Sequence, residues 1–241
     1  MNQETFDSIV RNRRSNRRFD PNIHVPKEVM QRSLERAILS PNSSNMQLWE
    51  FYWIQQEEEK KKYYEFCLHQ SAAKTADQIV VFVTRQDLWK SRTQWHLENI
   101  KNAIGNQEPT KLQQRGLGYY GKLMPMVYRT DLLGLNTLLR KVVCFFGGLF
   151  KPFMRLGGKA DQRVMVHKSC ALAAQTFMLS ISAEGFDTCP MEGFDKNRVR
   201  KSLGLPSSAE INMIIAVGKG TPEGIYGDRT RLPFEDVVFE R

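Results

Sequence analysis

Residues 13–19 read RRSNRRF, and no other stretch says as much about the fold of this 241-residue chain. Four arginines and a hydroxyl follow a short segment in which Phe6, Ile9 and Val10 recur at helical spacing. A guanidinium group binds phosphate oxygens through two parallel hydrogen bonds. A cluster of arginines beside a hydroxyl therefore indicates a loop that binds an anion rather than one that builds a core.

A second polar stretch leads directly into an aromatic segment. Residues 41–49 read PNSSNMQLW, and residues 49–55 continue as a strand rich in aromatic side chains. Asn, Gln and Ser side chains offer hydrogen-bond donors and acceptors that suit the edge of a planar heterocycle. Together the two stretches predict a bound cofactor that is flat and phosphorylated.

The hydrophobic pattern predicts helices packed on a small sheet. Residues 78–84 and 211–217 are continuous apolar runs, as in buried strands. Helices are predicted in six segments, at residues 3–13, 26–38, 57–71, 87–104, 164–184 and 195–203. Residues 105–165 contain many glycines and are predicted to be irregular. These elements indicate an α+β fold.

The composition argues against several kinds of site. The four cysteines lie far apart and include no C-x-x-C pair, so they predict free thiols in a reducing cytosol. The four histidines lack the spacing of metal ligands, and no metal is expected. The first residues lack the apolar region of a secretory signal, so a cytoplasmic location is expected.

Four motifs, in order along the chain, resemble the FMN-dependent nitroreductase family. Residues 13–19 match that family's Arg-Arg-Ser-x-Arg-x-Phe. Residues 41–49 resemble its Pro-Ser-Ser-x-Asn-x-Gln-Pro-Trp, with Asn42 in place of a Ser and Leu48 in place of the Pro. Residues 183–194 are similar to its flavin-facing loop, and residues 229–233 to its C-terminal basic pair. The resemblance covers residues 1–85 and 164–241 but not the middle of the chain.

The resemblance implies a role for each matching residue. The FMN phosphate would be held by Arg13, Ser15, Arg229 and Arg231, with Arg14 beside them. Arg17 would lie near the N1/C2 carbonyl edge of the flavin, where a cation stabilises the anionic reduced form. The flavin-facing loop would be formed by Pro190, Met191, Glu192 and Gly193. The backbone N–H groups of Glu192 and Gly193 would face N5 and O4.

The same resemblance implies one FMN-binding domain over residues 1–241, with an atypical insert at about 105–165. It implies a nitroreductase-like sandwich, with a mostly antiparallel sheet flanked by helices, that forms an intertwined homodimer. Ser43, Asn45 and Gln47 would reach the flavin of the other subunit. The helix over residues 164–184 carries small residues at its centre, such as Ala173 and Ala174, which suit close packing against a partner. The family's polar contact near residues 69–74 has four candidates here, namely His69, Gln70, Ser71 and Lys74.

The implied activity is hydride transfer from NAD(P)H through FMN to a nitroaromatic, a quinone or a similar oxidant. Two alternatives stay open: a dehalogenating or flavin-consuming enzyme of the same family, and a non-catalytic protein that binds FMN or docks on a membrane. Residues 218–224 read GKGTPEG and mimic a dinucleotide fingerprint, but Pro222 makes a poor helix opening there, so a turn is predicted. Glu184, near a helix end, is expected to be solvated rather than catalytic.

Residues 122–168 carry most of the excess positive charge. The formal net charge of the chain is +9, and this segment holds nine Lys or Arg against two acidic residues. Its apolar residues alternate with the basic ones, which predicts either a lid over the active site, the preferred interpretation, or a segment that contacts an anionic membrane. A spanning helix is not expected, because Arg140 and Lys151 bracket too few apolar residues. A nucleic-acid partner is not expected.

Overall fold

Four antiparallel strands form a sheet at the centre of the protein, in the order β1-β2-β4-β3. They are β1 (Trp49–Ile54), β2 (Gln78–Thr84), β4 (Glu210–Gly218) and β3 (Asp187–Met191). This computed structural model describes residues 3–129, 134–155 and 157–241. The predicted α+β class is confirmed, as are the strands expected at residues 49–55, 78–84 and 211–217.

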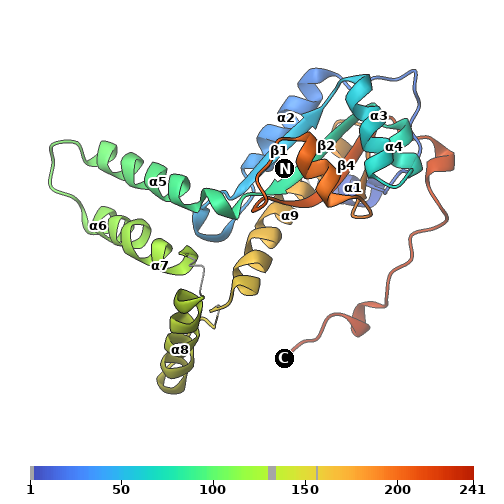
Figure 1. Ribbon diagram of the computed structural model, residues 1–241. Helices are drawn as coiled ribbons and strands as arrows, with labels where there is room; N and C mark the ends of the chain where they lie inside the picture. The colour runs from blue at the N-terminus through green and yellow to red at the C-terminus, as the bar shows by residue number, and fades with distance from the viewer. Residues whose placement is uncertain (1–2, 130–133, 156) are drawn as a thin grey trace.

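Helices cover both faces of the sheet, as Figure 1 shows. One face packs against α2 (Lys27–Ile38) and α9 (Lys159–Ala183), and the other against α3 (Glu57–Phe66), α4 (Ser71–Thr75) and α10 (Lys196–Ser202). Val80 and Phe82 of β2 belong to the first cluster, whereas Ile79 and Val81 belong to the second. Because β2 is buried on both faces, its sequence is a continuous apolar run rather than an alternating one. We call the sheet with these five helices the sandwich.

Two local predictions were wrong in the sandwich. The helix predicted over residues 57–71 is broken, because Leu68 and His69 adopt left-handed φ angles of 55° and 59° between α3 and α4. Strand β3 was expected only as a loop. Its Pro190 lacks the N–H of a ladder residue, which an edge strand tolerates, and β3 lies at the edge of the sheet.

The long helix α9 is the core helix of the sandwich. Ala173 and Ala174 are fully buried in the cluster that includes α2, so they are not available to a partner subunit as predicted. Within the described ranges, α9 is the one helix long and apolar enough to cross a membrane, with a mean hydropathy of 1.2 in a window that is 50% buried inside the protein. Its apolar residues are explained by the sheet that they cover.

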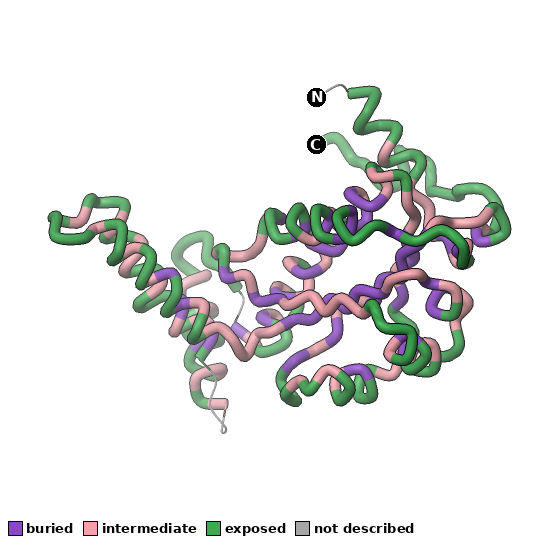
Figure 2. The backbone as a smooth tube through the Cα atoms, turned by 90° about the horizontal axis from the view of Figure 1, so that it is seen from above, coloured by how far each residue is buried: buried purple, intermediate pink, exposed green. Residues whose placement is uncertain are grey.

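Residues 105–165 are largely helical where the structure describes them, which contradicts the predicted irregularity. After α5 (Trp89–Ile104) come α6 (Lys111–Gly118), the π-helical turn η3 (Tyr119–Leu123), α7 (Met124–Tyr128) and α8 (Leu135–Phe150). Gly116 lies in α6, where a Cβ atom would come within 3.0 Å of Ile100. The glycine therefore marks a close contact with α5 rather than a helix break. We call α5 to α8, with the return segment 151–155, the arm; Figure 2 shows far less burial in it than in the sandwich.

The segment after α1 and the segment after β4 come together at one edge of the sandwich. Helix α1 (Gln3–Asn12) leads into the arginine-rich loop, which lies beside β3. After β4 the chain makes the predicted turn through η4 (Pro222–Gly224) and continues as an exposed tail, interrupted by η5 (Phe234–Asp236). The remaining short helices, η1 (Ser43–Asn45) and η2 (Gln86–Leu88), flank the edge strand β1 and the start of α5.

Candidate functional site

The arginine-rich loop is fixed to the edge strand β3 by its backbone. Ser15 forms a parallel bridge with Thr188, and the N–H of Asn16 donates to the carbonyl of Thr188 at 3.1 Å. The N–H of Arg17 donates to the carbonyl of Gly224 at 2.8 Å. The loop is therefore held between β3 on one side and the turn that follows β4 on the other.

Asn16 organises this loop from inside. Its side chain is buried, donates to the carbonyl of Thr221 at 2.9 Å and accepts from the N–H of Arg18 at 3.1 Å. A Cβ atom at Gly220 or Gly224 would overlap the Asn16 amide, so both positions need glycine for this close approach. Sequence reasoning missed Asn16, because its burial depends on the turn after β4, about 200 residues away in sequence.

The arginines predicted to hold a phosphate come together in one pocket of about 150 Å³. It is lined by Arg13, Arg14, Ser15, Arg17, Tyr226, Asp228, Arg229, Thr230 and Arg231. Five guanidinium groups thus share the pocket with a single carboxylate, that of Asp228. Partial burial, then the charges of Arg229, Arg231 and Arg14, lower the pKa of Arg13. An anion in the pocket would relieve this repulsion, so the pocket is chemically suited to bind one.

Two of the arginines also hold the pocket together. Arg229 donates to the carbonyls of Arg11 at 2.9 Å and Arg13 at 2.5 Å, at the C-terminal end of α1. Cations are favourable at this end of a helix. Arg14 donates to the carbonyl of Gly227 at 2.8 Å. Arg231 instead donates to the carbonyl of its neighbour Thr230 at 2.6 Å, so its guanidinium bridges no distant element in this way.

Arg17 lies between the pocket and strand β3. Its guanidinium carbon is 4.9 Å from the centre of the Tyr226 ring, a cation–π contact that the sequence did not suggest. Burial raises the pKa of the Cys189 thiol on β3, and the charge of Arg17 opposes that shift, which places Arg17 near the strand. Arg17 is thus positioned to act on a ligand that extends from the pocket along β3.

The predicted flavin-facing loop, residues 190–193, overlaps the end of β3. Pro190 and Met191 are strand residues paired with Ile215 and Ile214, and the Met191 side chain is buried in the core, so Met191 can offer a ligand only its backbone. The side-chain amide of Gln70 donates to the carbonyl of Gly193 at 2.6 Å. Of the four candidates between residues 69 and 74, Gln70 is therefore the one that contacts this loop.

The loop with Ser43, Asn45 and Gln47 lies elsewhere in the chain. It precedes β1, the edge strand opposite β3, so roughly 14 Å of sheet separates the two edges at three strand spacings. Ser44, Asn45 and Gln47 all have left-handed φ angles, of 57°, 50° and 49°. Backbone strain of this sort is often found at functional sites. The fold of one chain places this loop apart from the arginine pocket.

The arm holds this strained loop in place. The Nε2 atom of His96, in α5, lies 2.7 Å from the carbonyl oxygen of Asn45. The hydroxyl of Tyr120 donates to the carbonyl of Ser44 at 3.0 Å. The His96 and Tyr120 rings stack with centroids 4.1 Å apart. Tyr120 belongs to the π-helical turn, and such turns are frequent at functional sites. Sequence reasoning missed both residues, because each lies more than 50 positions along the chain from the loop residue that it contacts.

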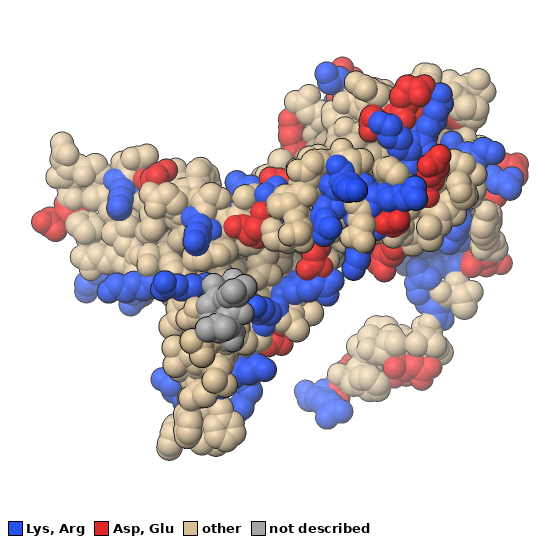
Figure 3. All heavy atoms as spheres, in the orientation of Figure 1, with Lys and Arg blue, Asp and Glu red and all other residues tan. Residues whose placement is uncertain are grey.

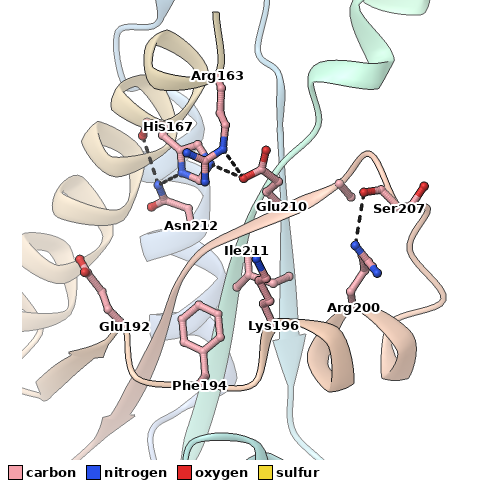
Figure 4. A pocket seen from close by; sticks show the side chains of 11 residues that line it. Arg163, His167, Glu192, Phe194, Lys196, Arg200, Ser207, Glu210, Ile211 and Asn212 are labelled. Atoms are coloured by element: carbon pink, nitrogen blue, oxygen red, sulfur yellow. Dashed lines mark hydrogen bonds and ion pairs between the residues drawn. The ribbon is translucent and has the colours of Figure 1, made fainter. Parts of the chain in front are cut away.

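A larger cavity, of about 660 Å³, lies beside Glu192 (Figure 4). Charges of both signs line it, and one carboxylate is paired with two of the basic groups. Glu210 accepts from Arg163 at 2.6 Å and lies 3.3 Å from His167, whose other ring nitrogen is 3.0 Å from Asn212. This pairing distinguishes the cavity from the arginine pocket, where like charges face one another.

Other titratable groups have structural partners. Glu184 forms ion pairs with Arg32 and Arg36, each at 2.8 Å, so it anchors α2 to the end of α9. These pairs lower the pKa of Glu184, with the Arg32 hydrogen bond as the largest cause. In the part of the chain that the structure describes, no group of three His, Cys, Asp or Glu is arranged to hold a metal ion.

Comparison with known proteins finds relatives that match most of the chain. A model of the Nitroreductase family matches residues 10–219. Protein DrgA of Synechocystis sp. is 26% identical over 230 residues, which cover 95% of this chain and 90% of that protein. A protein of Thermus thermophilus named NADH dehydrogenase is 27% identical over 231 residues, with 95% and 92% coverage. The fold is shared with a solved structure of an Exiguobacterium sibiricum protein in complex with FMN, at a TM-score of 0.68 and 22% identity, covering 98% of this chain and 97% of that one.

Proposed function

Because the chain belongs to the nitroreductase family of oxidoreductases, we propose that it binds FMN and carries reducing equivalents from NAD(P)H to a small-molecule oxidant. The single observation that carries this proposal is the arginine pocket, in which five guanidinium groups and the Ser15 hydroxyl surround about 150 Å³. That volume is below the range of about 300–1,000 Å³ for a whole small-molecule site, so the pocket suits one end of a ligand, such as a phosphate.

The residues fit the phosphate of FMN on chemical grounds. Arg13, Arg14 and Arg231 supply charged donors, and Ser15 supplies a hydroxyl. Arg229 closes the pocket and holds the end of α1 through its carbonyl contacts. The lowered pKa of Arg13, caused by burial and neighbouring arginines, shows a concentration of positive charge that a dianionic phosphate would offset.

The rest of the site follows from β3 and the loop after it. When bound, FMN supplies the redox chemistry by accepting a hydride and passing electrons onward. Arg17 would stabilise negative charge at the flavin edge, and the backbone N–H groups of Glu192 and Gly193 would orient the ring. Gln70 fixes that loop through the Gly193 carbonyl. No described side chain is needed as a proton donor, because water can serve.

A homodimer would complete the site. Ser43, Asn45 and Gln47 lie at the sheet edge opposite the arginine pocket, so they could reach a flavin only in another subunit. His96 and Tyr120 would then act as positioning residues, because they fix the backbone of the loop. The oxidant is proposed to be a nitroaromatic or a quinone, bound over the flavin at the subunit interface.

The absorbance spectrum of the purified protein tests this proposal. We expect a flavin spectrum with one noncovalent FMN per subunit, which bleaches when NADPH or NADH is added without oxygen and returns when a quinone is added. A protein that stays free of flavin in excess FMN would refute the binding site. A protein that binds FMN but is not reduced by either nicotinamide would instead be a non-catalytic flavin-binding member of the family.

A further inference from the structure

The end of the arm is a helical hairpin with unusual surface chemistry. Helix α8 and the return segment 151–155 form it, and we call residues 134–155 the α8 hairpin. Gly147 and Gly148 let the return segment approach α8 closely. A Cβ atom at Gly147 would come within 2.8 Å of the Phe153 ring. Cys144 donates to the carbonyl of Met154 at 3.4 Å, and Arg155 to the carbonyl of Gly148 at 3.1 Å. One face of α8 is thus covered by the hairpin itself.

The uncovered face of α8 carries a continuous apolar stripe. Its members recur at alternating intervals of three and four residues, with exposed fractions between 42% and 62%: Leu135, Leu138, Val142, Phe145 and Leu149. Phe150, at the end of the helix, is 86% exposed. Figure 1 shows α8 projecting from the sandwich, well away from α1, the helix that leads into the arginine-rich loop. The stripe therefore does not cover the candidate site of its own chain, and so many exposed apolar side chains mark an interaction surface.

The charge of the hairpin indicates what it contacts. Residues 134–155 contain four basic residues and no acidic one. Arg140 is buried and donates to the carbonyl of Arg129 at 2.6 Å, so it serves the structure of the arm. Lys141, Lys151 and Arg155 are exposed, and Figure 3 shows basic side chains flanking the uncharged tip of the arm. An anionic partner with an apolar interior complements this surface.

A second α8 hairpin fits this surface poorly. A symmetric contact between two α8 stripes would bring positive hairpins together, and paired helices use oppositely charged flanking residues for specificity. The hairpin has no carboxylate to supply the opposite charge. Spanning a membrane is also excluded by length, because the 16 residues of α8 are fewer than the roughly 20 that a span needs.

We propose that the α8 hairpin docks the protein on the surface of an anionic phospholipid bilayer. The stripe and Phe150 enter the boundary between headgroups and acyl chains, as in other interfacial amphipathic helices. Lys141, Lys151 and Arg155 lie at the level of the lipid phosphates, where each basic residue adds attraction. The sandwich, which carries the arginine pocket, stays in the aqueous phase.

Co-sedimentation of the full-length protein with vesicles tests this docking. The probes are vesicles of phosphatidylcholine alone and vesicles that contain about 30% phosphatidylglycerol. At low salt we expect at least about tenfold stronger partitioning to the anionic vesicles, and weaker partitioning as salt is raised. Absence of binding to anionic vesicles, or equal binding to both kinds, overturns the proposal. Because no flavin signal is read, this result is independent of the proposed enzymatic function.

Paired variants locate the docking surface. Phe145→Ser with Leu149→Ser, and separately Lys141→Glu with Lys151→Glu, are each expected to weaken partitioning by about tenfold or more. The matched controls change exposed residues elsewhere: Leu39→Ser with Leu112→Ser, and Lys27→Glu with Lys201→Glu. Far-UV circular dichroism verifies that each variant is folded. If the hairpin variants bind as the parent does, or if the serine pair lowers the oligomeric mass in light scattering, the stripe has another occupant and the proposal fails.

Discussion

Helices α9 and α8 are both rich in apolar residues, but they meet opposite surroundings. In α9, Cys170, Ala173 and Phe177 are fully buried between the sheet and α2. In α8, Leu149 and Phe150 are largely exposed at the end of the arm. The sandwich thus closes its core within one chain, whereas the arm leaves its apolar surface exposed. Apolar composition alone does not tell a core helix from a docking helix; the neighbouring elements do.

Alanine substitution at one phenylalanine in each helix gives the largest expected contrast. Phe177→Ala removes a fully buried ring from the sandwich and should lower the free energy of unfolding by about 3–5 kcal/mol. Phe150→Ala removes an exposed ring and should change it by less than about 0.5 kcal/mol. Urea denaturation of the two variants measures both values. Similar losses would show that α8 has a buried environment in solution and would break the contrast.

The arginine pocket gives the next largest effect. Arg231→Ala should weaken FMN binding by about 1.5–3 kcal/mol, the range for a hydrogen bond to a charged group. The free energy of unfolding should change little, because the Arg231 guanidinium donates its hydrogen bond to the carbonyl of the adjacent residue, Thr230. Arg155→Ala in the arm is the matched control and should leave the FMN dissociation constant unchanged. Fluorescence titration of the apoprotein provides the measurement, and equal constants for Arg231→Ala and the parent would remove Arg231 from the site.

Alkaline pH should weaken the sandwich through its buried thiols. Burial raises the pKa of Cys67 and of Cys170 to about 12. The folded state therefore retains these protons more strongly than the unfolded state, whose thiols titrate near 8.5. Their contribution to stability is complete below about pH 8.5 and is lost as the pH rises toward 12, by up to about 1.4 kcal/mol per pH unit for each thiol. Urea unfolding at several pH values should show a shallower decline for Cys170→Ala than for the parent protein, and parallel curves would contradict this.

The smallest expected effect concerns the contact between the arm and the strained loop. Tyr120→Phe removes the hydroxyl that donates to the Ser44 carbonyl and should cost about 0.5–1.5 kcal/mol in the free energy of unfolding. Tyr119→Phe is the matched control, because its hydroxyl meets Ser44 Oγ in an exposed contact and should matter less. Thermal unfolding ranks the two variants. A larger loss for Tyr119→Phe would reverse the assignment of Tyr120 as the residue that holds the loop.

The sequence predicted those parts of the molecule in which residue type alone determines the local structure or the ligand chemistry. Strands β2 and β4 were predicted because strands buried on both faces are apolar throughout. The arginines at both ends of the chain were predicted together, and the structure brings them into one pocket. The roles of Asn16 and Tyr226 were not predicted, because they depend on contacts between residues about 200 positions apart. The helices of the arm were missed because Gly116 was interpreted as a break, whereas it gives room to Ile100.

The fit of Asn16 between Gly220 and Gly224 has a consequence for engineering this protein. Neither glycine lines the pocket, so a library designed around ligand contacts would leave both free to vary. Any side chain there would displace the Asn16 amide and with it the backbone that presents the arginines. Selection for a new substrate should therefore preserve these two glycines in every active clone, while positions on the exposed face of α8 drift freely in an assay without lipid.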